Sequence, residues 1–313
     1  MPSNIAVIGE CMLEVSRLPT EEAAGQLPAA LSYGGDTLNT SVYLARQGVK
    51  VDYVTALGDD AMSGWMVDQW MAEHVGCHLV QRNPGAVPGL YMIEVDEHGE
   101  RSFLYWRKGS PATKLFDDEE SAEHLFSLLS SFGYIYFSGI TLALYKAPAL
   151  ARFLAFLERF RSEGGKVLFD GNYRPKLWKS RASAADMYEE VYRLTDIALP
   201  TIEDEQMVFG NETPDAIIDR LQDWGVTETV LKMGGKGCLV ATLDSRDLVE
   251  SNKVTVVDTT SAGDSFNAGY FASRIAGDDP ITAAKAGHKL ASVVIQHRGA
   301  IIPLEDMPKS ARD

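Results

Sequence analysis

The residues best suited to chemistry lie at positions 258–267, where an acid, two threonines and a Ser-Ala-Gly turn precede a second acid, Asp264. A β-rich run at positions 253–257 precedes this turn, and the small and apolar residues of a buried helix follow it. The backbone N–H groups of such a turn point at one spot, at the positive end of a helix dipole. Anions, and above all phosphates, are stabilised at such a place.

Asp264 lies at this positive end, and we expect the helix dipole to favour its ionised form. An ionised carboxylate is able to accept a proton. A base beside an anion-binding turn is what phosphoryl transfer to an alcohol requires. The alternative is that Asp264 is an ordinary helix cap after a glycine turn, so the rest of the chain has to decide between the two.

A second glycine turn lies near the N-terminus, at Gly34 and Gly35. Two consecutive glycines let the backbone approach a ligand closely, and Asp36 and Asn39 add directional polar groups. The pattern from residue 37 to residue 47 predicts a helix that ends at Gly48. The sequence therefore offers two ligand-binding turns, each at the start of a helix.

Strand and helix patterns alternate along most of the chain. Strands are expected at residues 4–9, 51–57, 134–138, 166–170, 196–199, 229–233 and 237–241. Helices are expected at residues 61–75, 148–162, 184–193, 202–209, 214–224, 262–276 and 280–297. This order predicts an α/β fold with a mostly parallel central sheet and helices on both faces. Ligands bind at the carboxyl ends of such strands, where Asp170, Lys232 and the loop before Asp264 would meet.

A smaller sheet is expected apart from the main one. The β-like runs at residues 89–95 and 101–107 are joined by DEHGE at 96–100, which is a hairpin signal. With the extended segments around residues 11–33, they predict a lid formed by about residues 11–33 and 88–108. Alternation would place Tyr105 and Arg107 on the same face. Because no repeat or long linker is present, we expect one domain over residues 1–313.

The bulk composition restricts the partners. A net charge of −15 and a pI near 4.9 argue against a nucleic-acid or acidic-membrane surface, so any anion site must concentrate Lys and Arg locally. The three cysteines are far apart and suggest free thiols in a reducing compartment. No signal peptide and no run of ~18 apolar residues is visible. We expect a cytoplasmic protein with no nucleic-acid and no membrane partner.

Two stretches resemble a known family. Residues 34–39 (GGDTLN) through 58–64 (GDDAMSG) resemble the first signature of the ribokinase/PfkB sugar kinases, and residues 258–264 (DTTSAGD) resemble the second, DTTGAGD. The resemblance spans essentially the whole chain. It implies a ribokinase-like α/β/α sandwich, ATP-dependent phosphorylation of a sugar, and Asp264 as catalytic base. It also implies that Ala262, Gly263 and Asp264 supply N–H groups to the transferring phosphate.

The same resemblance implies ATP and Mg²⁺ as cofactors, with a monovalent cation left open. Residues 232–237 (KMGGKG) look like the ATP-binding glycine turn of the family, although a simple hairpin turn would have the same composition. The residues then expected at ATP are Asn172, Arg174, Lys232, Gly234, Gly235, Lys236, Gly237, Ser261, Gly263 and Asn267. Thr201 and Asp204 replace the Asn and Glu of the NxxE motif of the family, which leaves Asp204 as the candidate for magnesium, through phosphate or water.

Within the family, GGDTLN, YWR at 105–107 and DGNYRPKLW at 170–178 are similar to the 2-keto-3-deoxygluconate kinases. Their substrate is a sugar acid, whose carboxylate Arg107 and Arg174 could bind bidentately. Each arginine could instead form a surface salt bridge or contact phosphate. The residues expected at the sugar are Gly34, Gly35, Asp36, Thr37, Leu38, Asn39, Tyr91, Tyr105, Arg107, Arg174 and Asp264.

Other classes fit less well. No GxGxxG follows the first strand and no GxxxxGK[ST] is present, which disfavours a Rossmann dehydrogenase and a P-loop enzyme. His74, Cys77 and His78 lack the further ligand that a metal site needs. A sugar-binding regulator without activity is the non-enzyme alternative, against which Asp264 argues, and fructokinase or another sugar kinase is the alternative within the family. The exposed edges of the lid sheet predict a homo-oligomer.

Overall fold

The computed structural model describes residues 2–18, 25–95 and 101–308. An eight-stranded sheet forms its centre, in the order β14-β13-β12-β11-β10-β9-β1-β4. Its strands are β1 (Ile5–Ile8), β4 (Val51–Val54), β9 (Tyr134–Ser138), β10 (Lys166–Asp170), β11 (Ile197–Ala198), β12 (Glu228–Lys232), β13 (Cys238–Thr242) and β14 (Arg246–Val249). Neighbours from β4 to β12 run parallel, and β13 and β14 add an antiparallel edge.

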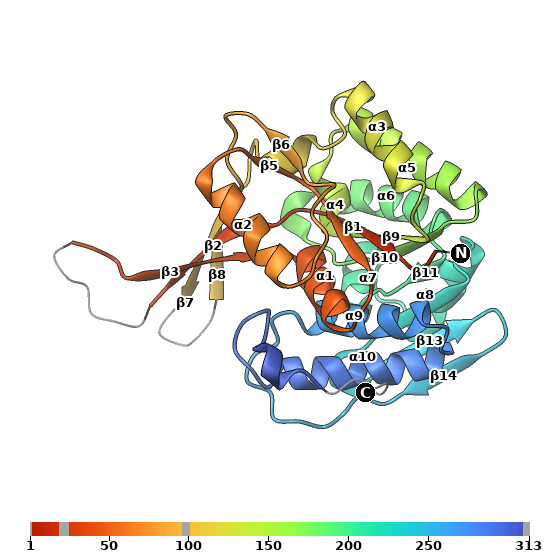
Figure 1. Ribbon diagram of the computed structural model, residues 1–313. Helices are drawn as coiled ribbons and strands as arrows, with labels where there is room; N and C mark the ends of the chain where they lie inside the picture. The colour runs from red at the N-terminus through yellow and green to blue at the C-terminus, as the bar shows by residue number, and fades with distance from the viewer. Residues whose placement is uncertain (1, 19–24, 96–100, 309–313) are drawn as a thin grey trace.

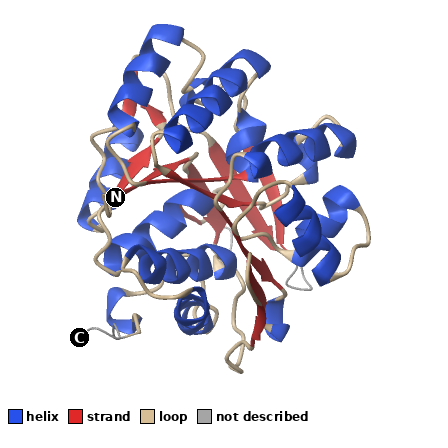
Figure 2. Cartoon of the chain, turned by 90° about the vertical axis from the view of Figure 1, so that its right-hand side faces the viewer, coloured by secondary structure: helices blue, strands red, loops and turns tan. Residues whose placement is uncertain are grey.

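Helices cover both faces of this sheet (Figure 2). One hydrophobic cluster joins the sheet to α1 (Asp36–Arg46), α2 (Ala61–Ala72), α9 (Ala262–Ile275) and α10 (Pro280–Val294). The other joins it to α3 (Glu119–Leu129), α4 (Gly139–Leu144), α5 (Ala147–Ser162), α6 (Arg181–Arg193), α7 (Ile202–Phe209) and α8 (Pro214–Asp223). Successive residues of β1 alternate between the two clusters, because strand side chains point to opposite faces.

A second sheet projects from the body as an arm (Figure 1). It has four strands in the order β3-β2-β7-β8. These are β2 (Met12–Arg17), β3 (Ala29–Gly34), β7 (Leu90–Val95) and β8 (Arg101–Trp106), while β5 (Ala56–Gly58) and β6 (Gln81–Asn83) form a separate pair. The antiparallel pairing of β7 with β8 fits the predicted hairpin, and the connecting residues 96–100 lie outside the described residues. The prediction of a sandwich with a mostly parallel sheet and a small second sheet is confirmed.

Two local predictions were wrong, and one strand was missed. Residues 253–257 form no strand; Val257 instead donates its N–H to the Ile295 carbonyl at 2.8 Å. The strand in this region is β14, where only Val249 is buried, so it lacks the apolar alternation that marks a strand. The run expected at 51–57 is divided between β4 and β5, which belong to different sheets.

In the described part of the chain, no helix is both long and apolar enough to cross a membrane.

Candidate active site

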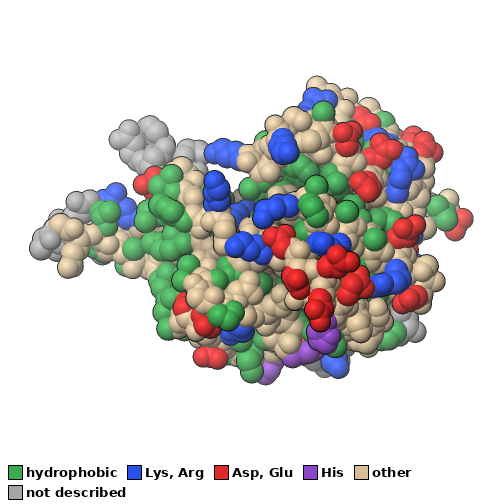
Figure 3. Space-filling model, turned by 90° about the horizontal axis from the view of Figure 1, so that it is seen from above, with side chains coloured by type: hydrophobic (Ala, Val, Ile, Leu, Met, Phe, Trp, Pro, Cys, Tyr) green, Lys and Arg blue, Asp and Glu red, His purple; other side chains and the backbone are tan. Residues whose placement is uncertain are grey.

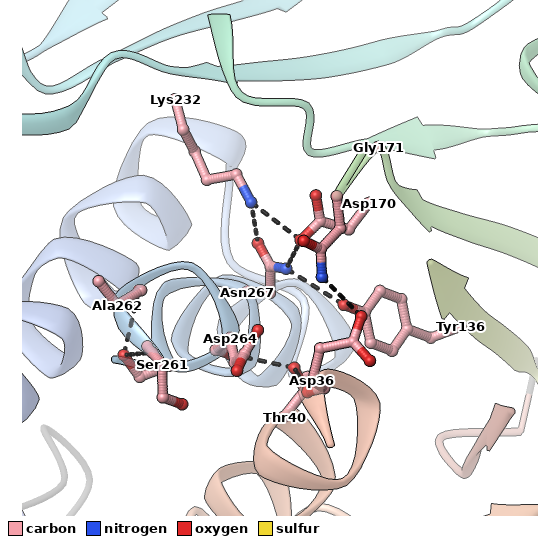
Figure 4. A network of polar contacts seen from close by, with 12 residues as sticks. Asp36, Thr40, Tyr136, Asp170, Gly171, Lys232, Ser261, Ala262, Asp264 and Asn267 are labelled. Carbon is pink, nitrogen blue, oxygen red and sulfur yellow. Dashed lines mark hydrogen bonds and ion pairs between the residues drawn. The ribbon is translucent and has the colours of Figure 1, made fainter. Parts of the chain in front are cut away.

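Asp264 lies in the first turn of α9, against the start of α1 (Figure 4). Asn39 Nδ2 donates a hydrogen bond to Asp264 Oδ2 at 2.8 Å, across a sequence separation of 225 residues. Thr40 Oγ1 donates to the carbonyl oxygen of Asp264 at 3.2 Å. The two glycine turns that the sequence singled out therefore meet at one place, the carboxyl edge of the central sheet.

The Asp264 carboxyl has a pKa raised to about 7. Burial is the largest cause, and the nearby carboxylates of Asp36 and Asp170 add to it, while the Asn39 amide and the Lys232 ammonium lower the pKa. Burial therefore acts against the helix dipole, which was expected to favour the ionised form. A carboxyl with a pKa close to neutrality is well matched to general base catalysis.

The turn predicted to bind an anion lies directly before Asp264. Ser261 has a left-handed conformation, with φ of 62°, and starts α9. The N–H of Ala262 donates to the Thr259 carbonyl at 3.2 Å, so it is already engaged. The N–H groups of Gly263 and Asp264 have no acceptor among the residues that the structure describes. A Cβ on Gly263 would lie 3.6 Å from Lys232 Nζ, which adds a positive charge beside these two donors.

A buried polar network fixes the Lys232 ammonium (Figure 4). Lys232 Nζ lies 3.1 Å from Asp170 Oδ2 and 3.1 Å from Asn267 Oδ1. Asn267 Nδ2 donates to Asp170 Oδ2 at 2.6 Å and to the Tyr136 hydroxyl at 3.2 Å. Asn267 is fully buried with both ends of its amide engaged, so it orients Lys232 and Asp170 instead of presenting a free amide to a nucleotide.

The turn before α1 shows why two glycines stand there. A Cβ on Gly34 would lie 2.1 Å from the Tyr91 hydroxyl, and one on Gly35 would lie 2.3 Å from the Glu10 carbonyl oxygen. Asp36 is half-buried, and its Oδ2 accepts a hydrogen bond from Asn172 Nδ2 at 2.6 Å. This hydrogen bond joins Asp36, which was expected at the sugar, to Asn172, which was expected at ATP.

Thr37 and Leu38 were also expected at the sugar, but both side chains are fully buried. Thr37 Oγ1 is 3.1 Å from the Tyr53 hydroxyl, inside the protein. Both residues are buried as a whole, backbone included, and their side chains hold α1 in place.

The arm brings aromatic rings and an arginine to the same region. Tyr91 and Tyr105 are paired across β7 and β8, with ring centres 5.9 Å apart. The Tyr91 hydroxyl donates to a carboxylate oxygen of Glu14. Arg107 Cζ lies 6.0 Å from the centre of the Tyr105 ring, as expected for residues on one face, and Arg107 Nε donates to the Glu10 carboxylate.

The glycine turn at 232–237 connects the antiparallel strands β12 and β13. Gly234 and Gly237 have φ of 56° and 98°, values that favour glycine. A Cβ on Gly237 would also lie 2.1 Å from the Val249 carbonyl oxygen. Gly235 and Lys236 are exposed at the tip of this turn. Residues 232–237 therefore form a hairpin turn, and this geometry is also compatible with the predicted ATP-binding loop.

Arg174 was expected at ATP and Asp204 at magnesium. Arg174 is exposed, and its NH1 donates to the Tyr173 carbonyl at 2.9 Å. Burial, and then the Asp170 carboxylate, raise the pKa of Asp204 to about 6, while Arg174 and Lys232 lower it. Within the described ranges, no cluster of three or more His, Cys, Asp or Glu side chains could hold a metal by itself. Asp204 could therefore contribute to a magnesium site only with help from phosphate or water.

Charge is distributed unevenly over the surface. Figure 3 shows Lys and Arg side chains around the hollow between the arm and the body, and Asp and Glu side chains gathered over the body. An acidic chain that binds anions must concentrate its cations in this way.

The model of the pfkB family of carbohydrate kinases matches residues 2–307. This chain is a pfkB family member. It is similar to a 2-dehydro-3-deoxygluconokinase of Escherichia coli K12, with 45% identity over 98% of this chain and 100% of the relative. It is 37% identical to a 2-dehydro-3-deoxygluconokinase of Haemophilus influenzae, over 96% of this chain and 95% of the relative.

Solved structures agree on the fold of this pfkB kinase. A Xylella fastidiosa fructokinase with bound ATP superposes with a TM-score of 0.84 at 20% identity, over 98% of this chain and 96% of that one. A candidate ribokinase II of E. coli in complex with ATP and Mg²⁺ gives a TM-score of 0.82 at 22% identity, over 98% and 96%. A fructokinase double mutant of Vibrio cholerae, bound to fructose, ADP and potassium, gives 0.79 at 22% identity, over 96% and 94%.

Sequence reasoning about this pfkB kinase missed three residues of the site. Glu10 and Glu14 accept hydrogen bonds from Arg107 and Tyr91, and Tyr136 closes the network around Asn267. Glu10 directly follows the first strand and its glycine, which was the one signal that could have identified it, because that strand also ends at the site. Glu14 and Tyr136 lie inside strands and carry no such signal.

Proposed function

We propose that this kinase transfers the γ-phosphoryl group of ATP to the terminal hydroxyl of 2-keto-3-deoxygluconate (2-dehydro-3-deoxy-D-gluconate), giving the 6-phosphate. The observation that carries the chemistry is the contact between Asp264 and Asn39, which brings a base at a phosphate-binding helix start to the sugar-binding turn. The names of the relatives that are 37–45% identical over nearly their whole length support the sugar acid as substrate.

In the proposed mechanism, the sugar acid lies between the turn at residues 34–39 and the arm. Asp264 accepts the proton of the terminal hydroxyl as that oxygen attacks the γ-phosphorus in line. The free N–H groups of Gly263 and Asp264, together with Lys232, stabilise the charge that develops on the transferring phosphate. Base catalysis of this kind contributes ~10² to 10⁴ in rate.

ATP and Mg²⁺ are part of the proposal. The glycine turn at 234–237 and the exposed Arg174 lie on the nucleotide side, and Arg174 is available to phosphate as well as to the sugar carboxylate. Asp204 fits a role at magnesium because burial, and then the neighbouring Asp170 carboxylate, raise its pKa, and a cation would stabilise the ionised form of both carboxylates. Mg²⁺ would neutralise charge on the phosphates there. Replacing Na⁺ by K⁺ in the assay tests the monovalent cation.

We also propose that residues 1–313 work as one domain with the four-stranded sheet as its lid, in the cytoplasm. The three cysteines are all free thiols, which supports a reducing compartment. The absence of a membrane or nucleic-acid partner stays a prediction from the acidic composition.

A side-by-side kinase assay tests the proposed function. Purified protein is given ATP, Mg²⁺ and, in turn, 2-keto-3-deoxygluconate, its galactose epimer, fructose and ribose, and ADP release is measured. We expect kcat/KM for the sugar acid to exceed the values for fructose and ribose by about 100-fold or more, because a site built to pair with a carboxylate leaves buried polar groups unpaired with a neutral sugar. A preference for fructose would replace the proposal with its alternative, fructokinase. No turnover of any sugar would favour the inactive regulator.

A further inference from the structure

Glu10 is a buried acid at the junction between the arm and the body. It follows β1, and its side chain is only 1% exposed. Both of its carboxylate oxygens are bonded to the chain that leaves the arm: Arg107 Nε donates to Oε2, and Ser110 Oγ donates to Oε1.

The other connections between arm and body pass the same residue. A Cβ on Gly89, where the chain enters β7, would lie 3.3 Å from Glu10 Oε1. A Cβ on Gly35, where the chain returns from β3, would lie 2.3 Å from the Glu10 carbonyl oxygen. Glu10 itself precedes β2, the first strand of the arm. All four connections therefore meet at Glu10.

Arg107 is held from one side only. Among the residues that the structure describes, Glu10 is the one carboxylate that pairs with it, and the bond uses Nε. The terminal nitrogens NH1 and NH2 have no acceptor within the same part of the chain. The Arg107 side chain is 15% exposed, so this free pair of donors remains open to a ligand. Two parallel N–H groups are the geometry that binds a carboxylate bidentately.

We infer that Glu10 is a positioning residue that sets specificity for the sugar acid: it holds Arg107 through Nε so that NH1 and NH2 meet the substrate carboxylate. The inference rests on the proposed function. Because the same carboxylate joins the arm to the body, the placement of the arm and the recognition of the carboxylate depend on one residue. A plain structural pin would not need this ion pair, since a buried pair is often no more stabilising than apolar residues of similar volume.

Steady-state kinetics of Glu10→Gln tests the inference, because this change keeps the volume and removes the charge. We expect KM for 2-keto-3-deoxygluconate to rise by about 10-fold or more, the usual effect of losing a charge-assisted contact, while kcat and KM for ATP change by less than about threefold. Glu228→Gln is the matched control. Glu228 is also a buried glutamate paired with an arginine, Arg274, but it lies at the opposite ends of the strands, so its change should leave KM for the sugar acid unaltered.

A double-mutant cycle separates positioning from packing. If Glu10 acts through Arg107, then Glu10→Gln raises KM for the sugar acid in the wild type but not further in an Arg107→Ala background. Equal effects in both backgrounds, or an unchanged KM in Glu10→Gln, would overturn the inference. Should Glu10→Gln fail to fold by thermal unfolding, Glu10→Asp, which keeps the charge but shortens its reach, should show the same selective rise in KM. The wild type measured alongside reports on the proposed function separately, since only the ratio of variant to wild type concerns Glu10.

Discussion

Asp264 shows how a single side chain is set for its work by opposing effects. Burial and the carboxylates of Asp36 and Asp170 disfavour its charge, whereas Asn39 and Lys232 favour it, and the balance raises its pKa to about 7. Such a group lowers the free energy of unfolding at neutral pH. A folded pKa above the unfolded value means that the free energy of unfolding falls as pH rises from the ordinary value of 3.8 towards about 7.

The first prediction at this scale concerns pH and Asp264. Because the base must be ionised in the free enzyme, kcat/KM for the sugar acid should rise with pH through about 7 and level off above it. Asp264→Asn should fold and bind ATP, lose about 100-fold or more of kcat, and lose this pH dependence. The measurement is a pH profile of kcat/KM for both proteins.

Two controls complete this experiment. Asp279→Asn changes an acid that caps α10, and because Asn caps a helix as well as Asp does, its profile should match the wild type. The stability of Asp264→Asn relative to wild type should increase between pH 5 and pH 8, since the variant no longer loses stability by ionising there. An unchanged kcat in Asp264→Asn would rule out Asp264 as the base.

At the scale of elements, the arm depends on contacts that only glycine permits. A Cβ on Gly34 would lie only 2.1 Å from the Tyr91 hydroxyl, which is too close for two atoms that are not bonded. Gly34→Ala should therefore displace the Tyr91 ring from the turn at residues 34–39. Because overpacking typically costs about 1–3 kcal/mol and about 1.4 kcal/mol is tenfold in affinity, we expect KM for the sugar acid to rise by about 10-fold or more. Kinetics with the sugar varied at saturating ATP measure this effect.

Two further variants check the cause. In Gly34→Ala/Tyr91→Phe the nearest remaining ring atom would be Cζ, at 3.3 Å, so this double variant should recover the thermal stability that Gly34→Ala loses. Gly64→Ala is the control, because a Cβ there meets nothing within 4 Å inside α2. It should leave the kinetics unchanged and stabilise the protein by about 1 kcal/mol. Wild-type kinetics in Gly34→Ala would contradict this prediction, because they would show that the turn accommodates a Cβ without affecting the site.

The elements were predictable where burial imposes a pattern. β1 is buried throughout and appears in the sequence as a continuous apolar run. β14 escaped prediction because an exposed edge strand carries charged and polar residues. Residues 253–257 have the composition of a strand, but no strand in the described part of the chain pairs with them. The composition of a segment indicates whether it is buried, whereas the pairing of one strand with another depends on the whole fold.

The site divides in the same way. The two turns and the role of Asp264 as a candidate base were readable from local residue types, and the family resemblance joined them. The contacts of Arg107 with Glu10 and of Asn267 with Asp170 span 97 residues each, and no local pattern contains them. For the same reason, the raised pKa of Asp264 could not be foreseen, since its largest cause is burial by distant parts of the chain.

At the scale of the whole molecule, one face of the arm carries a row of apolar side chains. Register partners place Leu31, Val15, Met92 and Leu104 in one row across all four strands, and this row is entirely apolar. Leu31 and Leu104, at its two ends, are 48% and 44% exposed. Within the described residues, β3 and β8 each have one edge with no strand paired to it. An exposed apolar row on such a sheet is a surface that favours association.

We propose that a second copy of the chain covers this row, which is the homo-oligomer expected from the sequence. Light scattering during size-exclusion chromatography should then give a mass of at least twice the 34.3 kDa of one chain. Leu104→Glu should shift the protein towards the monomer without unfolding it, because burying an unpaired charge in the interface costs several kcal/mol. Leu243→Glu, at a 70% exposed leucine outside the arm, should behave as the wild type. A wild-type protein that elutes at the mass of one chain, or a Leu104→Glu variant that associates unchanged, would mean that no second copy covers the arm.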